Sequence, residues 1–295
     1  MKINNDLLRV LVILFLTGFS QAARTQFTEP ENWIFQPEDK VIFEKVTGSL
    51  STRTDAPIGE LVMEAGKFFL ETPYVAHTLE TGEEQMVINL RELDCTTFAE
   101  NCLALSRTIQ SEDPAFEYFV HELQYIRYRN GVMDGYPSRL HYFCDWIYNN
   151  QQKGVIRDVS EEIAHTPLNK PINFMSTHPE EYMQLEKDPL LLEILAQLEE
   201  QITARTMYYI PEEKIAEVEH LLQDGDIAGI TTGIEGIAIM HVVILVRVDN
   251  RMHLLHASSA AGKVVLSEGT LEDYLLGSKS ATGIMVARPV QVQPD

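Results

Sequence analysis

Positive charge is scarce in this sequence of 295 residues. Lys and Arg together number 23 against 44 Asp and Glu, which gives a formal net charge of −21 at pH 7. Nucleic acids and anionic lipids are attracted through Lys and Arg, so this balance excludes a protein that binds either one through a general basic surface. The remaining composition, with 45% hydrophobic and 23% charged residues, excludes a disordered or collagen-like chain.

Long apolar runs are also scarce, and the one marked run lies at the N-terminus. Lys2 and Arg9 precede about ten mostly apolar residues, Val10 to Phe19, and small or polar residues follow at positions 20–23. A membrane-spanning helix needs about 20 apolar residues, so the run is too short for stable membrane insertion. We expect residues 1–22 to be a secretory signal peptide, with a buried N-terminal helix as the alternative.

Cysteine and metal-binding motifs are few. The three cysteines are an odd number, so at least one is free or pairs with another chain. Cys95 and Cys102 fall in one predicted helix, roughly 10 Å apart along its axis, whereas a disulfide needs Cα atoms within about 7 Å. We therefore expect no bond between them and interpret Cys102 and Cys144 as small core residues. No His-Glu-x-x-His or paired-cysteine spacing occurs, so the sequence predicts no metal site.

The pattern of apolar residues divides the rest of the chain into a helical half and a strand-rich half. Helical spacing predicts helices over residues 58–71, 96–109, 114–128, 138–150 and 180–206, while residues 173–178 read as extended chain. Alternation in steps of two predicts strands over residues 227–232, 237–248, 252–257, 264–266 and 284–289. We expect an α+β fold, one domain over residues 28–295, in which the helices pack on a small antiparallel sheet.

The segment from Arg91 to Phe98 carries the strongest local signal for chemistry. It places Cys95 in the first turn of a predicted helix, where free N–H groups and the helix dipole favour the nucleophilic thiolate. The backbone N–H of Cys95 is then available to stabilise an oxyanion. A structural cysteine at a helix start is the alternative.

Two histidines in the strand-rich half are candidates for the base that such a cysteine needs. If Asp249 and Asn250 form a two-residue turn, Val243 pairs with His256, and His241 and His256 become diagonal neighbours on one face, within about 7–8 Å. His253 then falls on the opposite face. A slip of one residue would separate the pair, and two histidines with purely structural hydrogen bonds are the alternative.

Several segments resemble a known enzyme family. Asp94-Cys95-Thr96-Thr97-Phe98 resembles the cysteine motif of the NlpC-type papain-like cell-wall hydrolases, commonly Asp-Cys-Ser-Gly, and Thr72-Pro73-Tyr74-Val75 resembles their Pro-Tyr segment. Together with this motif, further segments resemble the N-acetylmuramoyl-L-alanine amidase-like branch of Bacteroides-type bacteria. They are Ser138 to Phe143, Asp224 to Ile227, Leu254 to Ser259 and Gly262 to Val265. The matches span about residues 58 to 290.

The resemblance implies a role for each matching residue. Cys95 would be the nucleophile, His241 the general base and acid, and His256 the residue that orients His241. Tyr74 would supply a hydroxyl at the oxyanion, beside the Cys95 N–H. The chain departs from the common motif with Thr96-Thr97, and its stretch from Gly236 to Met240 is more apolar than expected, which leaves substrate contacts at positions 238 and 240 open.

The resemblance also implies the reaction and its setting. It indicates a papain-like cysteine amidase that cleaves the bond between N-acetylmuramic acid and L-alanine in muropeptides, with the anhydro form of the sugar as in cell-wall recycling. We expect no cofactor, no nucleic-acid partner and a monomer. With the signal peptide, the resemblance indicates export to the periplasm of a Gram-negative bacterium.

The residues that would bind substrate are less specific. The candidates are Asp94, Arg91, Arg139 and Tyr136. The two arginines are included because an arginine can bind a substrate carboxylate through two hydrogen bonds. Asp134 and His141 could line the same cleft, and Asn173, Ser176 and His178 could rim it or form a polar surface loop. For Arg139 the alternative is a structural ion pair with Asp134 or Asp145, and for His141 a packed helix position.

Two other functions stay open. One is an endopeptidase of the same superfamily that cuts after γ-D-glutamate, in which the Asp before the cysteine, here Asp94, meets a free L-alanine amine. The other is an inactive wall-binding module, which an unreactive Cys95 would indicate.

Overall fold

Helices make up most of the first half of the chain. The computed structural model describes residues 33–112 and 114–292, which all belong to one compact unit, so the predicted signal peptide lies outside the described residues. The helices are α1 (Pro37–Leu50), α2 (Ile58–Phe68), α3 (Cys95–Ile109), α4 (Phe116–Arg127) and α5 (Phe143–Gln152), with the 3-10 turns η1 (Arg129–Gly131) and η2 (Tyr136–Ser138). Two short strands, β1 (Trp33–Ile34) and β2 (Met86–Val87), pair in parallel.

The second half alternates short helices with strands. Its helices are α6 (Ser160–Ala164), α7 (Phe174–Thr177), α8 (Met183–Lys187), α9 (Pro189–Thr203), α10 (Ile215–Val218) and α11 (Leu271–Gly277), with the 3-10 turns η3 (Pro179–Glu181), η4 (Glu212–Lys214) and η5 (Glu219–Leu221). Its strands are β3 (Ile156–Asp158), β4 (Thr166–Pro167), β5 (Tyr208–Pro211), β6 (Ile227–Thr232), β7 (Ile239–Val248), β8 (Arg251–Ser258), β9 (Lys263–Thr270) and β10 (Ala281–Pro289). The mixed content is consistent with the α+β expectation.

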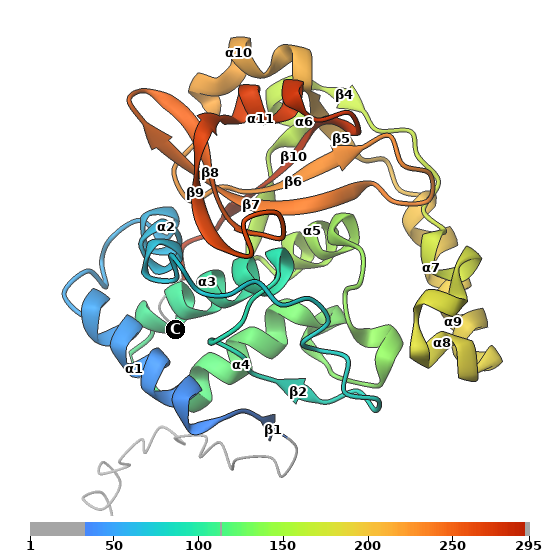
Figure 1. The fold of residues 1–295 in the computed structure, drawn as a ribbon, viewed down its shortest axis with the longest axis horizontal. Coiled ribbons are helices and arrows are strands. Elements are labelled where there is room, and N and C mark those ends of the chain that lie inside the picture. Colours follow the sequence, from blue (N-terminus) through green and yellow to red (C-terminus); the bar gives the residue numbers. More distant parts are fainter. Residues whose placement is uncertain (1–32, 113, 293–295) are drawn as a thin grey trace, which may run out of the picture. The chain divides into compact units, whose positions relative to one another are not determined.

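The strands of this half form one antiparallel sheet. Its order is β4-β5-β10-β6-β7-β8-β9, and β3 pairs with β10 to make eight strands. Helices α2, α3 and α5 lie on one side of the sheet and α10 and α11 on the other (Figure 1). The small sheet expected from the sequence is therefore larger, because strands β3, β4 and β5 precede the region of clear alternation.

Each face of the sheet has its own core. Val242 and Ile244 of β7 pack with the helices α2 to α5 in the larger core. Val243 and Leu245 of the same strand point the other way, into a second core that includes Leu271 and Leu275 of α11. A strand that is covered on both faces has no polar alternation, and this explains the near-continuous apolar sequence of β7.

The turn between β7 and β8 confirms the predicted pairing. Asp249 and Asn250 have φ angles of 48° and 65°, the left-handed values that a two-residue hairpin turn requires. The ladder runs from Val248 opposite Arg251 to Ile244 opposite Leu255, and one further step places Val243 opposite His256.

Several expected elements differ from the structure. Residues 173–178 were expected to be extended but contain helix α7, and the helix expected over residues 180–206 is divided into η3, α8 and α9 because Pro189 begins a new helix. The helix expected from residue 138 begins at Phe143. Helices α1 and α11 were not predicted. None of the helices within residues 33–112 and 114–292 is long and apolar enough to cross a membrane.

Candidate active site

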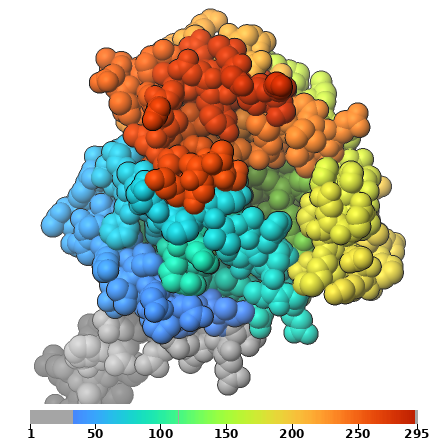
Figure 2. All heavy atoms as spheres, viewed as in Figure 1, coloured from blue at the N-terminus to red at the C-terminus, as the bar shows by residue number. Residues whose placement is uncertain are grey.

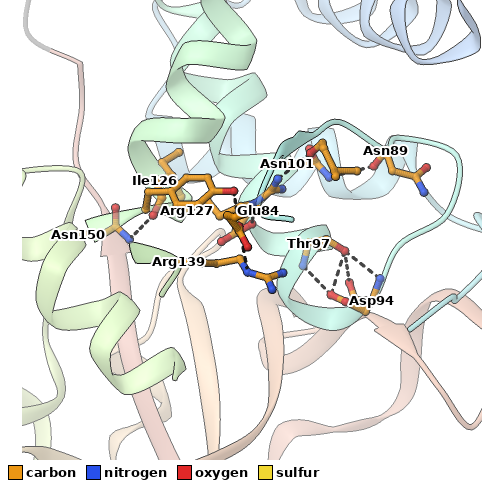
Figure 3. Close-up of polar contacts among 12 residues, drawn as sticks. Glu84, Asn89, Asp94, Thr97, Asn101, Ile126, Arg127, Arg139 and Asn150 are labelled. Atoms are coloured by element: carbon orange, nitrogen blue, oxygen red, sulfur yellow. Dashed lines mark hydrogen bonds and ion pairs between the residues drawn. The ribbon is translucent and has the colours of Figure 1, made fainter. Parts of the chain in front are cut away.

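The N-terminus of α3 positions Cys95. Asp94 is the N-cap, and its Oδ1 accepts a hydrogen bond from the Thr97 backbone N–H at 2.7 Å, while the Asp94 N–H donates to Thr97 Oγ1 at 2.9 Å (Figure 3). This reciprocal pair starts the helix at Cys95. The first N–H groups of a helix have no partner within the helix, so the Cys95 N–H meets the requirement for an oxyanion donor.

His241 and His256 face each other across β7 and β8. The Nε2 atom of His241 lies 2.6 Å from Nδ1 of His256, and the ring centroids are 4.9 Å apart at an interplanar angle of 73°. The predicted proximity of the two imidazoles is confirmed. If Nε2 of His241 carries the proton and donates it to His256, Nδ1 of His241 is left as a free proton acceptor. That is the tautomer a general base requires.

Burial keeps the thiol and both imidazoles neutral. It raises the pKa of Cys95 to about 11, with a further rise from the Asp94 charge and a partial offset by hydrogen bonds from the Val242 backbone and the Thr96 side chain. Burial lowers the pKa of His241 to about 3, with a contribution from His256, and that of His256 to about 4. Burial therefore opposes the thiolate expected at this helix start, because desolvation outweighs the hydrogen bonds that lower the Cys95 pKa. The hydrogen bond from Val242 also places the sulfur beside the strand position that follows His241.

Cys95 and His241 line one cavity of about 500 Å³. One wall is formed by residues 237–242, which are apolar except for His241 and include the start of β7, so positions 238 and 240 do reach the cavity. Residues of the opposite side come from α5 and from the segment around α7 and α8; they include Tyr142, Phe143, Cys144, Met175, Tyr182, Met183 and Gln184. A hollow between the teal segment before α3 and the yellow helices α7 to α9 is visible, with green residues at its floor (Figure 2).

Tyr74 lies near Cys95, as the oxyanion role would need. Its backbone N–H donates to Gly262 O at 2.9 Å, and the chain beside it bonds to Leu93, two residues before the cysteine. Burial raises the pKa of the Tyr74 phenol, and the charges of Cys95 and Asp94 raise it further. The phenol is thus within electrostatic range of the sulfur.

Tyr136 and His141 line the cavity, whereas Arg139 lies behind it. Arg139 has a side chain only 7% exposed that pairs with Glu80 at 2.7 Å. It also pairs with Glu84 at 3.3 Å (Figure 3). The predicted ion pair of Arg139 with Asp134 or Asp145 is therefore wrong. The guanidinium also lies 5.1 Å from the Tyr136 ring centroid, and Nε2 of His141 is bonded to Tyr136 O at 2.8 Å.

The structure does not bring Arg91 or Asp94 to the cavity wall. Arg91 Nε pairs with the buried carboxylate of Asp39 at 3.1 Å, an interaction that joins the start of α1 to the chain before α3. Asp94 acts as the helix cap. Asn173, Ser176 and His178 do not line the cavity within the described chain, although Met175 between them does.

Some lining residues had no signal in the sequence. Glu80 accepts a hydrogen bond from Gln184 Nε2 at 2.8 Å, which links the loop before β2 to α8 across 104 positions of the chain. Tyr182 and Met183 lie at the start of the helix predicted over residues 180–206, but helical spacing did not indicate that they face a cavity. By contrast, Tyr136 and His141 were candidates from the sequence, and both line the cavity.

No metal site is found in the part of the chain that the structure describes, where no three His, Cys, Asp or Glu side chains gather in a suitable group. All three cysteines are free thiols, and Cys102 and Cys144 are buried as predicted.

Comparison with known proteins gives one family and several similar structures. The AmiA-like family, described as N-acetylmuramoyl-L-alanine amidase-like, matches residues 64–284. A crystal structure of an N-acetylmuramoyl-L-alanine amidase from Bacteroides uniformis is 38% identical with a TM-score of 0.76, over 79% of this chain and 99% of that one. A Bacteroides fragilis protein provisionally named a xylanase is 39% identical with a TM-score of 0.72, over 76% of this chain and 98% of that one.

A more distant structure shares the fold. A protein from Legionella pneumophila is 22% identical with a TM-score of 0.66, over 87% of this chain and 96% of that one. Among curated proteins, none matches the chain.

Proposed function

The chain belongs to the AmiA-like, N-acetylmuramoyl-L-alanine amidase-like family, and from this premise we propose that Cys95 is the nucleophile that cleaves the bond between N-acetylmuramic acid and the L-alanine of the peptide stem. The family implies a substrate related to peptidoglycan. The observation that carries the proposal is the arrangement of Cys95 at a helix start, in one cavity with a histidine whose Nε2 is bonded to a second histidine.

The first half of the proposed reaction forms a thioester. As the Cys95 sulfur attacks the lactyl carbonyl carbon, the thiol proton moves to Nδ1 of His241. Since both groups are neutral at rest, this transfer accompanies the attack instead of preceding it. The carbon–nitrogen bond then breaks, and the imidazolium proton goes to the departing L-alanine amine. His256 accepts the Nε2 hydrogen bond and so stabilises the imidazolium and its orientation.

The second half hydrolyses the thioester. His241 accepts a proton from water, the hydroxide oxygen bonds to the acyl carbon, and the sulfur leaves and recovers a proton. The products are the muramic acid carboxylate and the free stem peptide. The oxyanion of both steps would lie against the Cys95 N–H and the Tyr74 hydroxyl, each worth about 3–4 kcal/mol of transition-state stabilisation.

The finer assignments belong to the same proposal. A papain-like fold of the NlpC type is supported by the order of Cys95, His241 on one strand and His256 on the next. The apolar run at residues 10–19 supports export to the periplasm. The resemblance supports a substrate that carries the anhydro form of the sugar. We further propose that the protein is a monomer, needs no cofactor and acts on muropeptides in cell-wall recycling.

The endopeptidase alternative has less support than the amidase. It rested on Asp94 meeting a substrate amine, but Oδ1 of Asp94 accepts hydrogen bonds from both the backbone N–H and the hydroxyl of Thr97. Helix capping thus engages one oxygen of this carboxylate, and together with the family match this leads us to favour the amidase.

Mass spectrometry of products tests the proposal. Purified muropeptides, with and without the anhydro sugar, are incubated with wild type, Cys95→Ala and the control Cys102→Ala, which removes a buried thiol away from the cavity. Intact stem peptide beginning with L-alanine is expected from wild type and control but not from Cys95→Ala. Cleavage after γ-D-glutamate would refute the bond assignment, and no cleavage of either bond would favour a binding module.

A further inference from the structure

A tyrosine outside the sequence motifs lies against both histidines. Tyr274 belongs to α11, and its ring centroid is 6.3 Å from that of His241 at an interplanar angle of 27°. The same ring is 6.1 Å from His256 at 83°. One aromatic side chain therefore stacks on the first imidazole and meets the second edge to face.

Short-range contacts hold this tyrosine in place. Thr270 caps α11, with its N–H donating to Asp273 Oδ2 at 2.9 Å and the Asp273 N–H donating to Thr270 Oγ1 at 3.2 Å. Leu271 and Leu275 are fully buried in the core on this face of the sheet. A helix fixed at its start and along one face leaves the Tyr274 ring little freedom to move away from the imidazoles.

Few charged or titratable groups face His241 from the elements around it. β8 contributes His256, α3 contributes Cys95 with Asp94 beside it, and α11 contributes Tyr274. β6, with the sequence Ile227 to Thr232, has no titratable side chain. The acidic residues of α11 are engaged elsewhere, since Glu272 pairs with Arg251 at 2.7 Å and Asp273 completes the cap. The half-buried Tyr274 ring is the aromatic group that α11 places against both imidazoles.

We propose that Tyr274 is a positioning residue, whose ring shields the hydrogen bond between the two histidines and holds the His241 imidazole in the plane needed to accept the Cys95 proton. The role rests on the proposed cysteine mechanism. Its physical basis is that a water molecule competing for Nε2 of His241 would weaken the bond to His256 and let the ring rotate. Burial and then the nearby Cys95 raise the pKa of the phenol, which agrees with a neutral, sheltered side chain.

The test separates the ring from the hydroxyl. Tyr274→Phe keeps the ring and Tyr274→Leu removes it, while Leu276→Ala, at a side chain 62% exposed on the same helix, controls for changes in α11. All variants are first compared by thermal unfolding. The His241 titration is then followed by NMR of the imidazole in a Cys95→Ala background, which needs no catalytic activity, and kcat and KM are measured with Cys95 present.

Tyr274→Leu is expected to raise the pKa of His241 toward its ordinary value and to lower kcat by about tenfold or more at unchanged KM. Tyr274→Phe should keep the wild-type titration and recover most of that kcat, and Leu276→Ala should match wild type. An unchanged titration in Tyr274→Leu, or a rise in KM alone, would overturn the positioning role. A loss of kcat in Tyr274→Phe as large as in Tyr274→Leu would instead assign a role to the hydroxyl and also refute it. If neither wild type nor any variant cleaved muropeptides, the proposed function would fail. The His241 titration would still decide whether the Tyr274 ring shields the histidine pair.

Discussion

His241 and His256 lie 2.6 Å apart, from Nε2 to Nδ1, because a turn at the far end of their strands sets the register. Asp249 and Asn250 both adopt left-handed backbone angles, and the ladder that they start runs without a slip to Ile244 opposite Leu255. A one-residue slip of this register would move one imidazole to the other face of the sheet. The pair is thus a product of strand pairing.

Replacing His256 should lower kcat more than it affects KM. Without its Nδ1 acceptor, the His241 tautomer and ring plane are no longer fixed, so His256→Ala is expected to reduce kcat by about 10²-fold. His256→Asn should retain part of the rate because its Oδ1 can accept the same hydrogen bond. His253→Asn is the control, since His253 bonds to Ser267 O instead. Steady-state kinetics with full activity in His256→Ala would contradict the assignment.

Alkylation of Cys95 should depend steeply on pH. The thiol pKa of about 11 means that only a small fraction is thiolate at neutral pH, and the iodoacetamide rate should rise about tenfold for each pH unit between 7 and 10. Peptide mapping assigns the modified residue, with Cys95→Ala as the blank. A rate that is already maximal near pH 7 would show a preformed thiolate and contradict a neutral resting pair.

Arg139 should contribute to stability and not to substrate affinity. Arg139→Met leaves the Glu84 carboxylate buried without its cation and should lower the free energy of unfolding by about 3–5 kcal/mol in urea titrations. The double variant Glu84→Gln with Arg139→Met should regain much of that loss. Lys263→Met, which breaks an exposed pair with Glu71, should cost at most about 1 kcal/mol. An Arg139→Met enzyme of normal stability with a greatly raised KM would instead favour the substrate role.

Acid should destabilise the fold partly through His141. Burial lowers its pKa from the ordinary 6.5 to about 3, so between these values the unfolded chain binds a proton that the folded chain does not. Stability from this group is full above pH 6.5 and is lost as the pH falls toward 3. His141→Gln can keep a donor to Tyr136 O, and its melting temperature should fall less than that of wild type between pH 7 and pH 5. Equal falls would exclude His141 as a source of acid sensitivity.

The sequence predicts the catalytic candidates better than the walls around them. Cys95 at a helix start and the hairpin of β7 and β8 follow from local signals, namely a capping residue and a two-residue turn. Tyr182 and Gln184 reach the cavity only through long-range packing that local periodicity does not encode. The partners of Arg139 were mistaken for the same reason, because Glu80 and Glu84 lie in a loop more than 50 positions away.

Helix α11 shows a second limit of the sequence. It is only seven residues long, and helices this short have weak periodicity, so no helix was predicted from the sequence between β9 and β10. The pKa of the Cys95 thiol shows a third limit. The sequence indicates that Cys95 lies at a helix start, but it does not show the burial that raises the pKa.

Trapping with hydroxylamine tests the central claim most directly. A thioester between Cys95 and the lactyl acyl group would react with hydroxylamine, so mass spectrometry of a muropeptide digest should show a muramyl hydroxamate with wild type and none with Cys95→Ala. A hydroxamate on the γ-D-glutamyl carboxyl would show that the acyl group comes from the peptide stem. Continued release of stem peptide without any hydroxamate would contradict the covalent cysteine mechanism itself.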